Sequence, residues 1–246
     1  MKILITGASS GLGAELARQY ASPQNELILL ARREDKLYAL RSELFLICKS
    51  VEVIVADVRD FKPLQEKIQK IATLDMVILN AGISLGHSGN TEHIPTIEEF
   101  ENLYRVNVLS VHAILEILLP VFKAQGHGKI VFISSLASLF TMPSSKIYSS
   151  SKRALNAYAE GIRYKYNRYG IKVTNILPGF IKSELTDKNE FKMPFLLETK
   201  VGVSKIIKAI EKDKRTYVFP LRFYLIIQLL NLLPSFLREK IVDSLS

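Results

Sequence analysis

The chain has 246 residues, of which 48% are hydrophobic, and it carries a formal net charge of +9 at pH 7. This length fits one α/β domain with a substantial core, because a domain of this size buries most of the surface that its unfolded chain exposes. The Lys and Arg residues are scattered and form no basic tract interleaved with aromatic residues, so the charge does not indicate nucleic-acid binding and fits solubility and attraction of a polyanion instead.

Short apolar runs rich in β-branched residues alternate along the chain with longer stretches of helical periodicity. The short runs predict strands at residues 2–6, 26–31, 51–56, 76–79, 129–134, 172–177 and 217–219. The longer stretches predict helices at residues 11–21, 33–47, 61–72, 96–124, 144–169 and 203–212. Strands that alternate with helices predict a parallel sheet, and two such halves form a doubly wound α/β fold of the Rossmann type, with helices on both faces and ligands at the carboxyl ends of the strands.

The sequence shows no internal repeat, low-complexity stretch or linker, so we expect a single domain over residues 1–221 and a hydrophobic tail over residues 222–246. An uncharged run in the tail lies between Arg222 and Arg238. It is too short for a helix that spans a membrane, and Pro234 would break it. We expect the tail to pack as a lid or a subunit contact, and attachment to a membrane surface is the alternative. A cationic helix face would favour that alternative; it consists of Lys205, Lys208 and Lys212.

The cysteine and histidine residues limit which disulfide bonds and metal sites the chain can form. Cys48 is the sole cysteine, so the chain cannot form an internal disulfide and nothing suggests an oxidising compartment. It lies in an apolar run, where a small core residue is the expected role. One cysteine and four histidines without a His-x-x-x-His pair predict no metal site. A strand follows Lys2 directly, so we expect no signal peptide and a cytoplasmic protein.

The first predicted strand runs into a glycine-rich turn with the spacing Gly7-x-x-x-Gly11-x-Gly13. Glycines are needed where a backbone turns tightly and approaches a pyrophosphate closely. The helix that begins at Gly11 would offer free N–H groups and a positive dipole end to the phosphates. An ordinary tight loop is the alternative. At the first strand–helix junction of the chain, the turn favours dinucleotide binding.

The end of the second predicted strand bears on which dinucleotide would bind. Sites for NAD carry an acid here, about 20 residues after the glycine turn, and this acid binds the ribose hydroxyl. The present chain has Arg32 and Arg33 instead. A guanidinium can hold a 2′-phosphate with two hydrogen bonds, so Arg32, with Arg33 beside it, favours NADP. A solvated arginine at a helix start is the alternative.

Tyr148 and Lys152 lie four residues apart in a predicted helix, and Ser135 lies thirteen residues before the tyrosine. This spacing puts the tyrosine and the lysine on one helix face. A fixed ammonium near a phenol favours the phenolate and lowers the pKa of the phenol, which makes a tyrosine usable as a general acid or base. A solvated helix face is the alternative for the pair on its own.

Seven short stretches follow one another in register along the chain. They are Thr6 to Gly13, Asp57 with Val58, Asn80 to Gly82, Asn107, Ser135, Tyr148 with Lys152, and Pro178 with Gly179. Together they resemble the short-chain dehydrogenase/reductase family in its compact, single-domain form, over residues 2 to about 185. The resemblance implies a doubly wound domain that catalyses oxidation or reduction with a nicotinamide cofactor.

The resemblance implies roles for four catalytic residues. Tyr148 would donate a proton when a carbonyl is reduced and accept it in the reverse reaction, and Lys152 would bind the nicotinamide ribose and hold down the pKa of the tyrosine. Ser135 would hydrogen-bond the carbonyl oxygen, with Ser134 as the alternative for this role. Asn107 would position a water that relays protons from the lysine to solvent; a polar residue that interrupts a helix is the alternative.

The resemblance also implies the cofactor contacts. Asp57 would bind the adenine, and Asn80 with its two successors would leave room beside the ribose, although capping or turn roles are the alternative for both residues. Thr6 is either a fastener between strand and turn or a ligand, and Ser183 stands where the family usually has threonine. The full predicted set is Gly7, Ser9, Ser10, Gly11, Leu12, Gly13, Arg32, Asp57, Val58, Asn80, Ala81, Gly82, Tyr148, Lys152, Pro178, Gly179, Ile181 and Ser183.

These residues predict an NADP-dependent oxidoreductase that moves a hydride between the nicotinamide and a carbonyl or secondary alcohol carbon. The alternatives are an NAD-preferring alcohol dehydrogenase and a non-catalytic nucleotide-binding scaffold at a membrane surface, and the complete catalytic set argues against the scaffold.

The polar segment at residues 182–200 would cover a small-molecule substrate, and His87 would be an exposed loop residue or a substrate contact. An apolar pocket favours a hydrophobic ketone, aldehyde or acyl-type substrate; its predicted lining is Leu85, Leu136, Leu139, Phe140, Met142, Phe180 and Leu185.

Assembly is a further expectation from the resemblance. In the family, the helix that bears the tyrosine packs against its symmetry mate together with the helix before it. The corresponding stretches here are residues 144–169 and 96–124. We therefore expect a C2 homodimer, with a homotetramer built as a dimer of dimers as the alternative.

Overall fold

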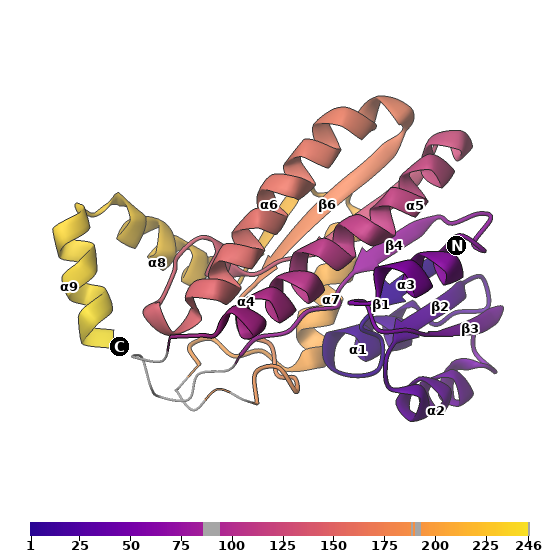
Figure 1. Ribbon diagram of the computed structural model, residues 1–246, viewed down its shortest axis with the longest axis horizontal. Helices are drawn as coiled ribbons and strands as arrows, with labels where there is room; N and C mark the ends of the chain where they lie inside the picture. Colours follow the sequence, from indigo (N-terminus) through magenta and orange to yellow (C-terminus); the bar gives the residue numbers. More distant parts are fainter. Residues whose placement is uncertain (86–93, 188, 190–192, 246) are drawn as a thin grey trace.

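The computed structural model of the chain describes residues 1–85, 94–187, 189 and 193–245. Within these residues, seven parallel strands form one sheet in the order β3-β2-β1-β4-β5-β6-β7 (Figure 1). Each lies within one residue of its predicted bounds at either end, because strands buried on both faces are near-continuous apolar runs. The strands are β1 (Lys2–Thr6), β2 (Glu26–Ala31), β3 (Ser50–Val55), β4 (Met76–Leu79), β5 (Gly128–Ile133), β6 (Ile171–Pro178) and β7 (Thr216–Phe219).

Helices cover both faces of the sheet, as predicted. The first group, α1, α2 and α7, packs on one face, and the second group, α3, α5 and α6, packs on the other. In β1, the side chains of Ile3 and Ile5 join the core beneath the first group, while Leu4 joins the core beneath the second. The helices are α1 (Gly11–Tyr20), α2 (Glu34–Leu44), α3 (Phe61–Ile68), α4 (Ile97–Tyr104), α5 (Ser110–Gln125), α6 (Lys146–Tyr166), α7 (Thr199–Glu211), α8 (Leu221–Leu232) and α9 (Ser235–Leu245).

The strand order reverses between β1 and β4. The chain leaves β1 for β2 and β3 on one side, then crosses back to place β4 on the other side, so that β1 pairs with both β2 and β4. In a doubly wound sheet, a crevice for a ligand opens at this point, outside the carboxyl ends of the strands. The loops that follow the strands carry the predicted site residues to this edge. The predicted fold class is therefore confirmed.

The helix predicted at residues 96–124 forms one continuous helical stretch, Ile97–Gln125, which contains a π-helical turn that was not predicted. α4 begins with a capping box, in which the Thr96 hydroxyl accepts from the N–H of Glu99 and the Glu99 carboxylate accepts from the N–H of Thr96. A π-helical turn at Arg105–Leu109 then separates α4 from α5. Wide turns of this kind often mark functional sites, and the buried Asn107 lies within this one. Helical periodicity alone does not reveal such a turn.

The tail forms two helices, because Pro234 separates α8 from α9 as predicted. The two helices lie at one end of the molecule, at the left in Figure 1. α8 packs against β7, and its Ile227 side chain is 4% exposed, whereas Leu229 and Leu232 are 65% and 81% exposed. The tail therefore has a packed face and an exposed apolar face. The predicted boundary between residues 221 and 222 falls at the start of α8 and stays a prediction.

One helical stretch among the described residues, Ile97–Gln125, is long and apolar enough to cross a membrane by length and composition. More than half of its most apolar window, 56%, is buried inside the protein. Its α5 portion packs against α3, and buried core helices commonly meet the same criterion. We therefore assign this stretch to the core of the domain.

Candidate active site

A cleft of about 450 Å³ opens at the carboxyl ends of the strands. The loops after β1, β2, β3, β4, β5 and β6 line it, together with the first two turns of α6. The predicted site residues that line this cleft are Gly7, Ser9, Ser10, Gly11, Leu12, Arg32, Asp57, Val58, Asn80, Ala81, Gly82, Ser135, Tyr148, Lys152, Pro178, Gly179, Ile181 and Ser183. Two predicted residues, Gly13 and Asn107, are not part of this lining.

The turn after β1 needs its glycines for two different reasons. Gly7 and Gly11 have φ angles of 67° and 52°, in the left-handed region that residues with side chains seldom adopt. Gly13 instead lies against the turn, because a Cβ atom there would come 2.1 Å from the carbonyl oxygen of Gly7 and 2.7 Å from Nδ2 of Asn80. Gly13 therefore allows α1 to pack closely on the turn and does not line the cleft.

Thr6 fastens the turns that follow β1 and β4. Its Oγ1 accepts from the N–H groups of Asn80 at 2.9 Å and Ala81 at 3.0 Å, and it donates to the carbonyl of Ile78 at 3.3 Å. Asn80 in turn donates from Nδ2 to the Thr6 carbonyl at 2.9 Å. The Thr6 side chain is buried and its hydroxyl is occupied by these bonds, so of its two expected roles the structure favours the fastener.

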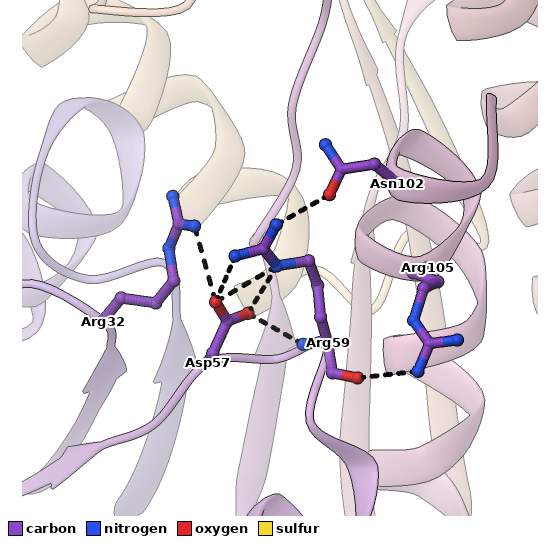
Figure 2. A network of polar contacts seen from close by, with 5 residues as sticks. All are labelled: Arg32, Asp57, Arg59, Asn102 and Arg105. Carbon is purple, nitrogen blue, oxygen red and sulfur yellow. Dashed lines mark hydrogen bonds and ion pairs between the residues drawn. The ribbon is translucent and has the colours of Figure 1, made fainter. Parts of the chain in front are cut away.

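Asp57 lies between two arginines where β2 and β3 end (Figure 2). Arg59 donates from Nη2 to the carboxylate at 2.7 Å and reaches Asn102 of α4 at 2.9 Å, while Nη1 of Arg32 lies 3.5 Å from the same carboxylate. Burial acts to raise the pKa of Asp57, but the hydrogen bonds and charge of Arg59, with the charge of Arg32, hold it below its ordinary value. Asp57 is therefore an anion held at the edge of the cleft. The sequence analysis did not identify Arg59.

Arg33 lies across the glycine turn. It donates from Nε to the Ser9 hydroxyl at 3.1 Å and from Nη2 to the Ser10 hydroxyl. Its Nη1 lies 2.8 Å from the carboxylate of Glu184, which also accepts from Ser10 at 2.9 Å and from Lys36 at 2.8 Å. Neither Glu184 nor Lys36 was predicted. Through these hydrogen bonds and ion pairs, Glu184 in the segment after β6 is linked to the glycine turn and to the residues that follow β2, at the mouth of the cleft.

The inner end of the cleft holds a tyrosine–serine pair. The Tyr148 hydroxyl is hydrogen-bonded to the side chain of Ser135. Ser135 also accepts at Oγ from the N–H of Ala137 at 3.1 Å, which fixes its rotamer. Burial raises the pKa of Tyr148 to about 12, and the bond to Ser135 opposes this shift only in part. The phenol is therefore protonated at neutral pH.

Lys152 follows Tyr148 by one turn of α6 and is 4% exposed. Its Nζ donates to the carbonyl of Ile133 at 2.9 Å and lies 5.7 Å from the centre of the Tyr148 ring. Burial lowers the pKa of Lys152 to about 8. The structure brings the two side chains together, but the expectation that the lysine lowers the pKa of the tyrosine was wrong. Burial disfavours the charged form of both groups and is the largest cause of both shifts in pKa.

Asn107 lies behind the cleft and holds the backbone after β4. Its Oδ1 accepts from the N–H of Ile83 at 2.8 Å, and its Nδ2 donates to the Ile83 carbonyl at 3.0 Å and to Ser151 at 3.1 Å. A Cβ atom on the neighbouring Gly82 would lie 3.4 Å from both Asn107 and the Nζ of Lys152. Asn107 therefore positions the main chain beside the lysine. The predicted relay through a water stays a prediction.

Ser134 belongs to a separate polar network under the cleft. Its hydroxyl bonds Asn156 at 2.7 Å, and Asn156 in turn bonds Ser138 at 2.7 Å and Asn175 at 2.9 Å. Ser135 is therefore the serine that bonds Tyr148, and its role toward a carbonyl oxygen stays a prediction. The network braces the loop after β5 against α6, and the sequence analysis missed Asn156 because a single asparagine within a helix carries no spacing signal.

The segment after β6 faces the glycine turn across the cleft. A Cβ atom on Gly11 would lie 3.2 Å from the Cβ of Ser183. The buried Thr186, which was not predicted, accepts from the N–H of Ser183 at 2.8 Å and donates to the carbonyl of Ile181 at 3.1 Å. Ile181 also pairs with Leu197 in a β-bridge. These bonds fix the start of the segment that was predicted to cover the substrate.

α8 packs on the side of the site where the substrate pocket was predicted. Ile227 joins Leu136 and Leu177 in a small apolar cluster. Phe223 of α8 extends this contact, because its ring centre lies 5.9 Å from the ring centre of Phe180 and also 5.9 Å from that of Phe195. The inner face of the tail therefore covers apolar residues next to the cleft, as a lid would.

The residues predicted to line the substrate pocket have mixed positions. Leu185 lines the cleft, whereas Leu139 and Phe140 pack with the α8 cluster. Leu85 is 40% exposed. Some of these apolar side chains, Leu136, Leu139 and Phe140, therefore pack against α8 and contribute to the apolar cluster there.

The remaining predictions concern the cysteine, the histidine His87 and a metal site. Cys48 is buried in the core, as expected for a small apolar residue. His87 lies outside the described residues. Among the described residues, no group of three or more His, Cys, Asp or Glu side chains is placed to hold a metal ion.

Comparisons with known proteins give the family. A model of the short chain dehydrogenase family matches residues 1–193. An uncharacterised oxidoreductase from Myxococcus xanthus is 34% identical over 236 residues, which cover 94% of this chain and 92% of the relative. An Arabidopsis thaliana protein named 11-beta-hydroxysteroid dehydrogenase-like 2 is 33% identical over 217 residues, 85% of this chain and 68% of the relative.

A solved structure shares the fold. It is a short-chain dehydrogenase from Sphingobium yanoikuyae in complex with NADPH, with a TM-score of 0.81 and 24% identity, and the match covers 95% of this chain and 96% of that one. The family match spans most of the chain and includes the glycine turn, Asn107, Ser135, Tyr148 and Lys152. The chain therefore belongs to the short-chain dehydrogenase/reductase family of enzymes.

Proposed function

We propose that the chain is an NADP-dependent oxidoreductase that moves a hydride between the nicotinamide and a carbonyl or secondary alcohol carbon of a hydrophobic substrate. The observation that carries the proposal is the meeting of Tyr148, Ser135 and Lys152 at the inner end of the cleft. A bound nicotinamide would supply the hydride chemistry, and the chain would supply proton transfer, orientation and charge placement.

Tyr148 is suited to give a proton to an oxygen atom in the cleft. With a pKa of about 12, its phenol is protonated at neutral pH and can act as a general acid. The neighbouring Ser135 hydroxyl can bond the same oxygen and stabilise the negative charge that develops there. The ammonium of Lys152 near the ring would then favour the phenolate that remains after the proton has left.

The residues of the cleft fit a dinucleotide with a 2′-phosphate. Gly7 and Gly11 let the backbone approach a pyrophosphate, and the side chain of Ser10 does not cap α1, so the first N–H groups of this helix remain available. At the end of β2, Arg32 and Arg33 stand where an NAD site carries an acid. This supports NADP over the NAD-preferring alternative. The Sphingobium protein with the same fold was solved with NADPH.

The substrate class rests on the apolar surroundings of Tyr148. Leu136, Phe180 and Phe223 form an apolar bed beside the reacting end of the cleft. Leu185 is a further apolar residue in the lining of the cleft. A hydrophobic ketone, aldehyde or acyl-type carbonyl compound fits these surroundings, and one relative is named for a hydroxysteroid.

We also propose a cytoplasmic homodimer that assembles through α5 and α6. These helices are already joined within one chain, because His112 of α5 bonds the hydroxyl of Tyr158 in α6 at 2.8 Å. Together they form a flat helical layer on one face of the sheet (Figure 1). A dimer of dimers is the alternative. Sedimentation at micromolar concentration tests this, and a monomer alone would contradict it.

The test of the function is NADPH oxidation, followed at the absorbance of the reduced nicotinamide, with a panel of hydrophobic ketones and aldehydes. We expect turnover with at least one member and a smaller kcat/KM when NADH replaces NADPH. Binding of NADPH without turnover of any carbonyl or alcohol would favour the scaffold alternative instead.

A further inference from the structure

Glu184 lies in a small anion-binding site at the mouth of the cleft. Its carboxylate accepts from the hydroxyl of Ser10 at 2.9 Å and from Nζ of Lys36 at 2.8 Å, and it lies 2.8 Å from Nη1 of Arg33. The donors are a hydroxyl, an ammonium and a guanidinium, which is a set of groups that binds a phosphate equally well. The site is held in shape by Arg33, which also bonds Ser9 and Ser10.

These donors strongly favour the ionised carboxylate. The hydrogen bond from Lys36 is the largest cause, burial opposes it, and the bonds from Ser10 and Arg33 add to it, so that the pKa of Glu184 falls to about 2. Glu184 is therefore ionised at every pH at which the protein would work. The chain itself supplies an anion at the place where β2 ends.

The same place is where a dinucleotide would carry its distinguishing group. In doubly wound domains, the residues at the end of the second strand face the 2′ position of the adenosine ribose. Arg33 stands at this position, but its guanidinium is already paired with Glu184. A 2′-phosphate and the Glu184 carboxylate would compete for one set of donors.

We propose that Glu184 is a specificity-determining residue that occupies the 2′-phosphate site of the free protein and so weakens the preference for NADPH over NADH. This inference rests on the proposed function, because it requires that the cleft binds a nicotinamide dinucleotide. NADPH must displace Glu184 from Arg33 and Lys36 before its phosphate can bind there. NADH has no 2′-phosphate and leaves these ion pairs intact.

The structure allows this displacement without unfolding of the segment. The base of the segment is tied, since the N–H of Lys182 donates to the carbonyl of Leu197 at 2.9 Å and the Thr199 hydroxyl bonds the Lys182 carbonyl at 2.6 Å. Glu184 lies beyond this tie, in a turn closed by bonds from the N–H groups of Thr186 and Asp187 to the Ser183 carbonyl. The Glu184 side chain, half exposed at 51%, can swing into solvent while the tie remains.

The test compares Glu184→Gln with Glu198→Gln by direct binding. Glu198 lies in the same segment and pairs with Lys182 at 3.9 Å, so this control removes one negative charge without touching the anion site. The fluorescence of the reduced nicotinamide reports binding of NADPH and NADH directly. Calorimetric titrations with 2′-AMP and 5′-AMP repeat the comparison without the nicotinamide.

We expect Glu184→Gln to tighten NADPH and 2′-AMP by about fivefold, because two exposed ion pairs no longer need to be broken. NADH and 5′-AMP should change by less than about twofold, and Glu198→Gln should leave all four affinities at the wild-type values. Thermal unfolding checks that both variants are folded, and Glu184→Ala repeats the test with a smaller side chain.

The possible failures are distinguishable. Equal changes for NADPH and NADH, or weaker binding of NADPH to Glu184→Gln, would overturn the role of Glu184 and leave the proposed function standing. Failure of the wild-type protein to bind either dinucleotide would overturn the proposed function and this inference together.

Discussion

The side-chain amide of Asn107 bonds both backbone groups of Ile83, accepting from its N–H at 2.8 Å and donating to its carbonyl at 3.0 Å. Asn107 lies in a π-helical turn between α4 and α5, and Ile83 follows Gly82, whose Cα faces Nζ of Lys152. The buried side chain of Asn107 therefore fixes the course of the main chain next to Lys152.

The first prediction concerns this pair. Asn107→Leu would remove the side-chain partner of both the N–H and the carbonyl of Ile83, a half-buried residue that lines the cleft, at a cost of roughly 1–3 kcal/mol for each group. We expect the free energy of unfolding, measured by urea denaturation, to fall by about 2–6 kcal/mol. Asn167→Leu, at an exposed position, is the matched control and should change it little. An unchanged midpoint in Asn107→Leu would show that Asn107 does not hold this loop.

The second prediction concerns proton transfer. Tyr148→Phe removes only the hydroxyl, so NADPH should still bind while turnover falls by about two to four orders of magnitude. Tyr164→Phe, on the exposed side of the same helix, should retain turnover. Lys152→Ala should weaken both cofactor binding and turnover, because the lysine has two proposed roles. Near-normal turnover in Tyr148→Phe would contradict the mechanism.

The third prediction follows from the buried ammonium of Lys152. Its pKa is about 8 in the folded protein and about 10.5 in the unfolded chain, so between these pH values the unfolded chain binds more protons. Its contribution to stability therefore rises as pH increases from 8 to 10.5, and it is unfavourable by about 3 kcal/mol below pH 8. Lys152→Met should unfold at a higher temperature than wild type at pH 7.

The control for this prediction is the pH dependence itself. The advantage of Lys152→Met over wild type should shrink as pH rises from 8 toward 10.5, and it should be constant below pH 8. The raised pKa of Tyr148 has the opposite sign and acts only above about pH 10. A variant that is less stable than wild type at pH 7 would show that the ammonium is stabilised by its bond to Ile133 more than burial destabilises it.

The fourth prediction concerns cofactor choice at the end of β2. Arg32→Ala should reduce the preference for NADPH over NADH by roughly 1–3 kcal/mol, the scale of a charge-assisted hydrogen bond. Arg33→Ala should reduce it as well, and it should also leave Glu184 held at the glycine turn by Ser10 and Lys36 alone. Titration of both cofactors against wild type and the two variants measures this. Equal or tighter binding of NADH by the wild-type protein would contradict the assignment to NADP.

The fifth prediction separates the two faces of α8. Ile227→Asp places a charge in the cluster with Leu136 and Leu177 and should lower the melting temperature by several degrees. Leu229→Asp, at a position that is 65% exposed, should leave the melting temperature near the wild-type value. If the exposed face binds a membrane surface, Leu229→Asp should also reduce sedimentation with anionic liposomes, and this binding should weaken with salt.

The fold and the cofactor side of the cleft could be predicted because their signals are local. An apolar run such as β4 is a strand whatever surrounds it, and the φ angles of Gly7 and Gly11 are met most readily by glycine. The pair of Tyr148 and Lys152 could be predicted for the same reason, since one helical turn joins them.

The parts that could not be predicted depend on contacts between distant residues. Glu184 meets Lys36 across 148 positions of the chain, and no spacing rule covers that distance. The π-helical turn at Asn107 was not predicted, and the bonds that Asn107 makes there reach a loop residue 24 positions away. The pKa of Tyr148 was predicted in the wrong direction because a sequence shows the neighbouring charge but not the extent of burial.

The order of the chain gives the packing of α8 a consequence for synthesis. The glycine turn, the arginines after β2 and the first residues after β4 all lie within the first 82 residues, so they leave the ribosome early. The helix that covers Leu136 and Leu177 begins at Leu221, after the last strand of the sheet. A nascent chain would therefore expose this apolar bed until α8 has been synthesised, after every strand of the sheet.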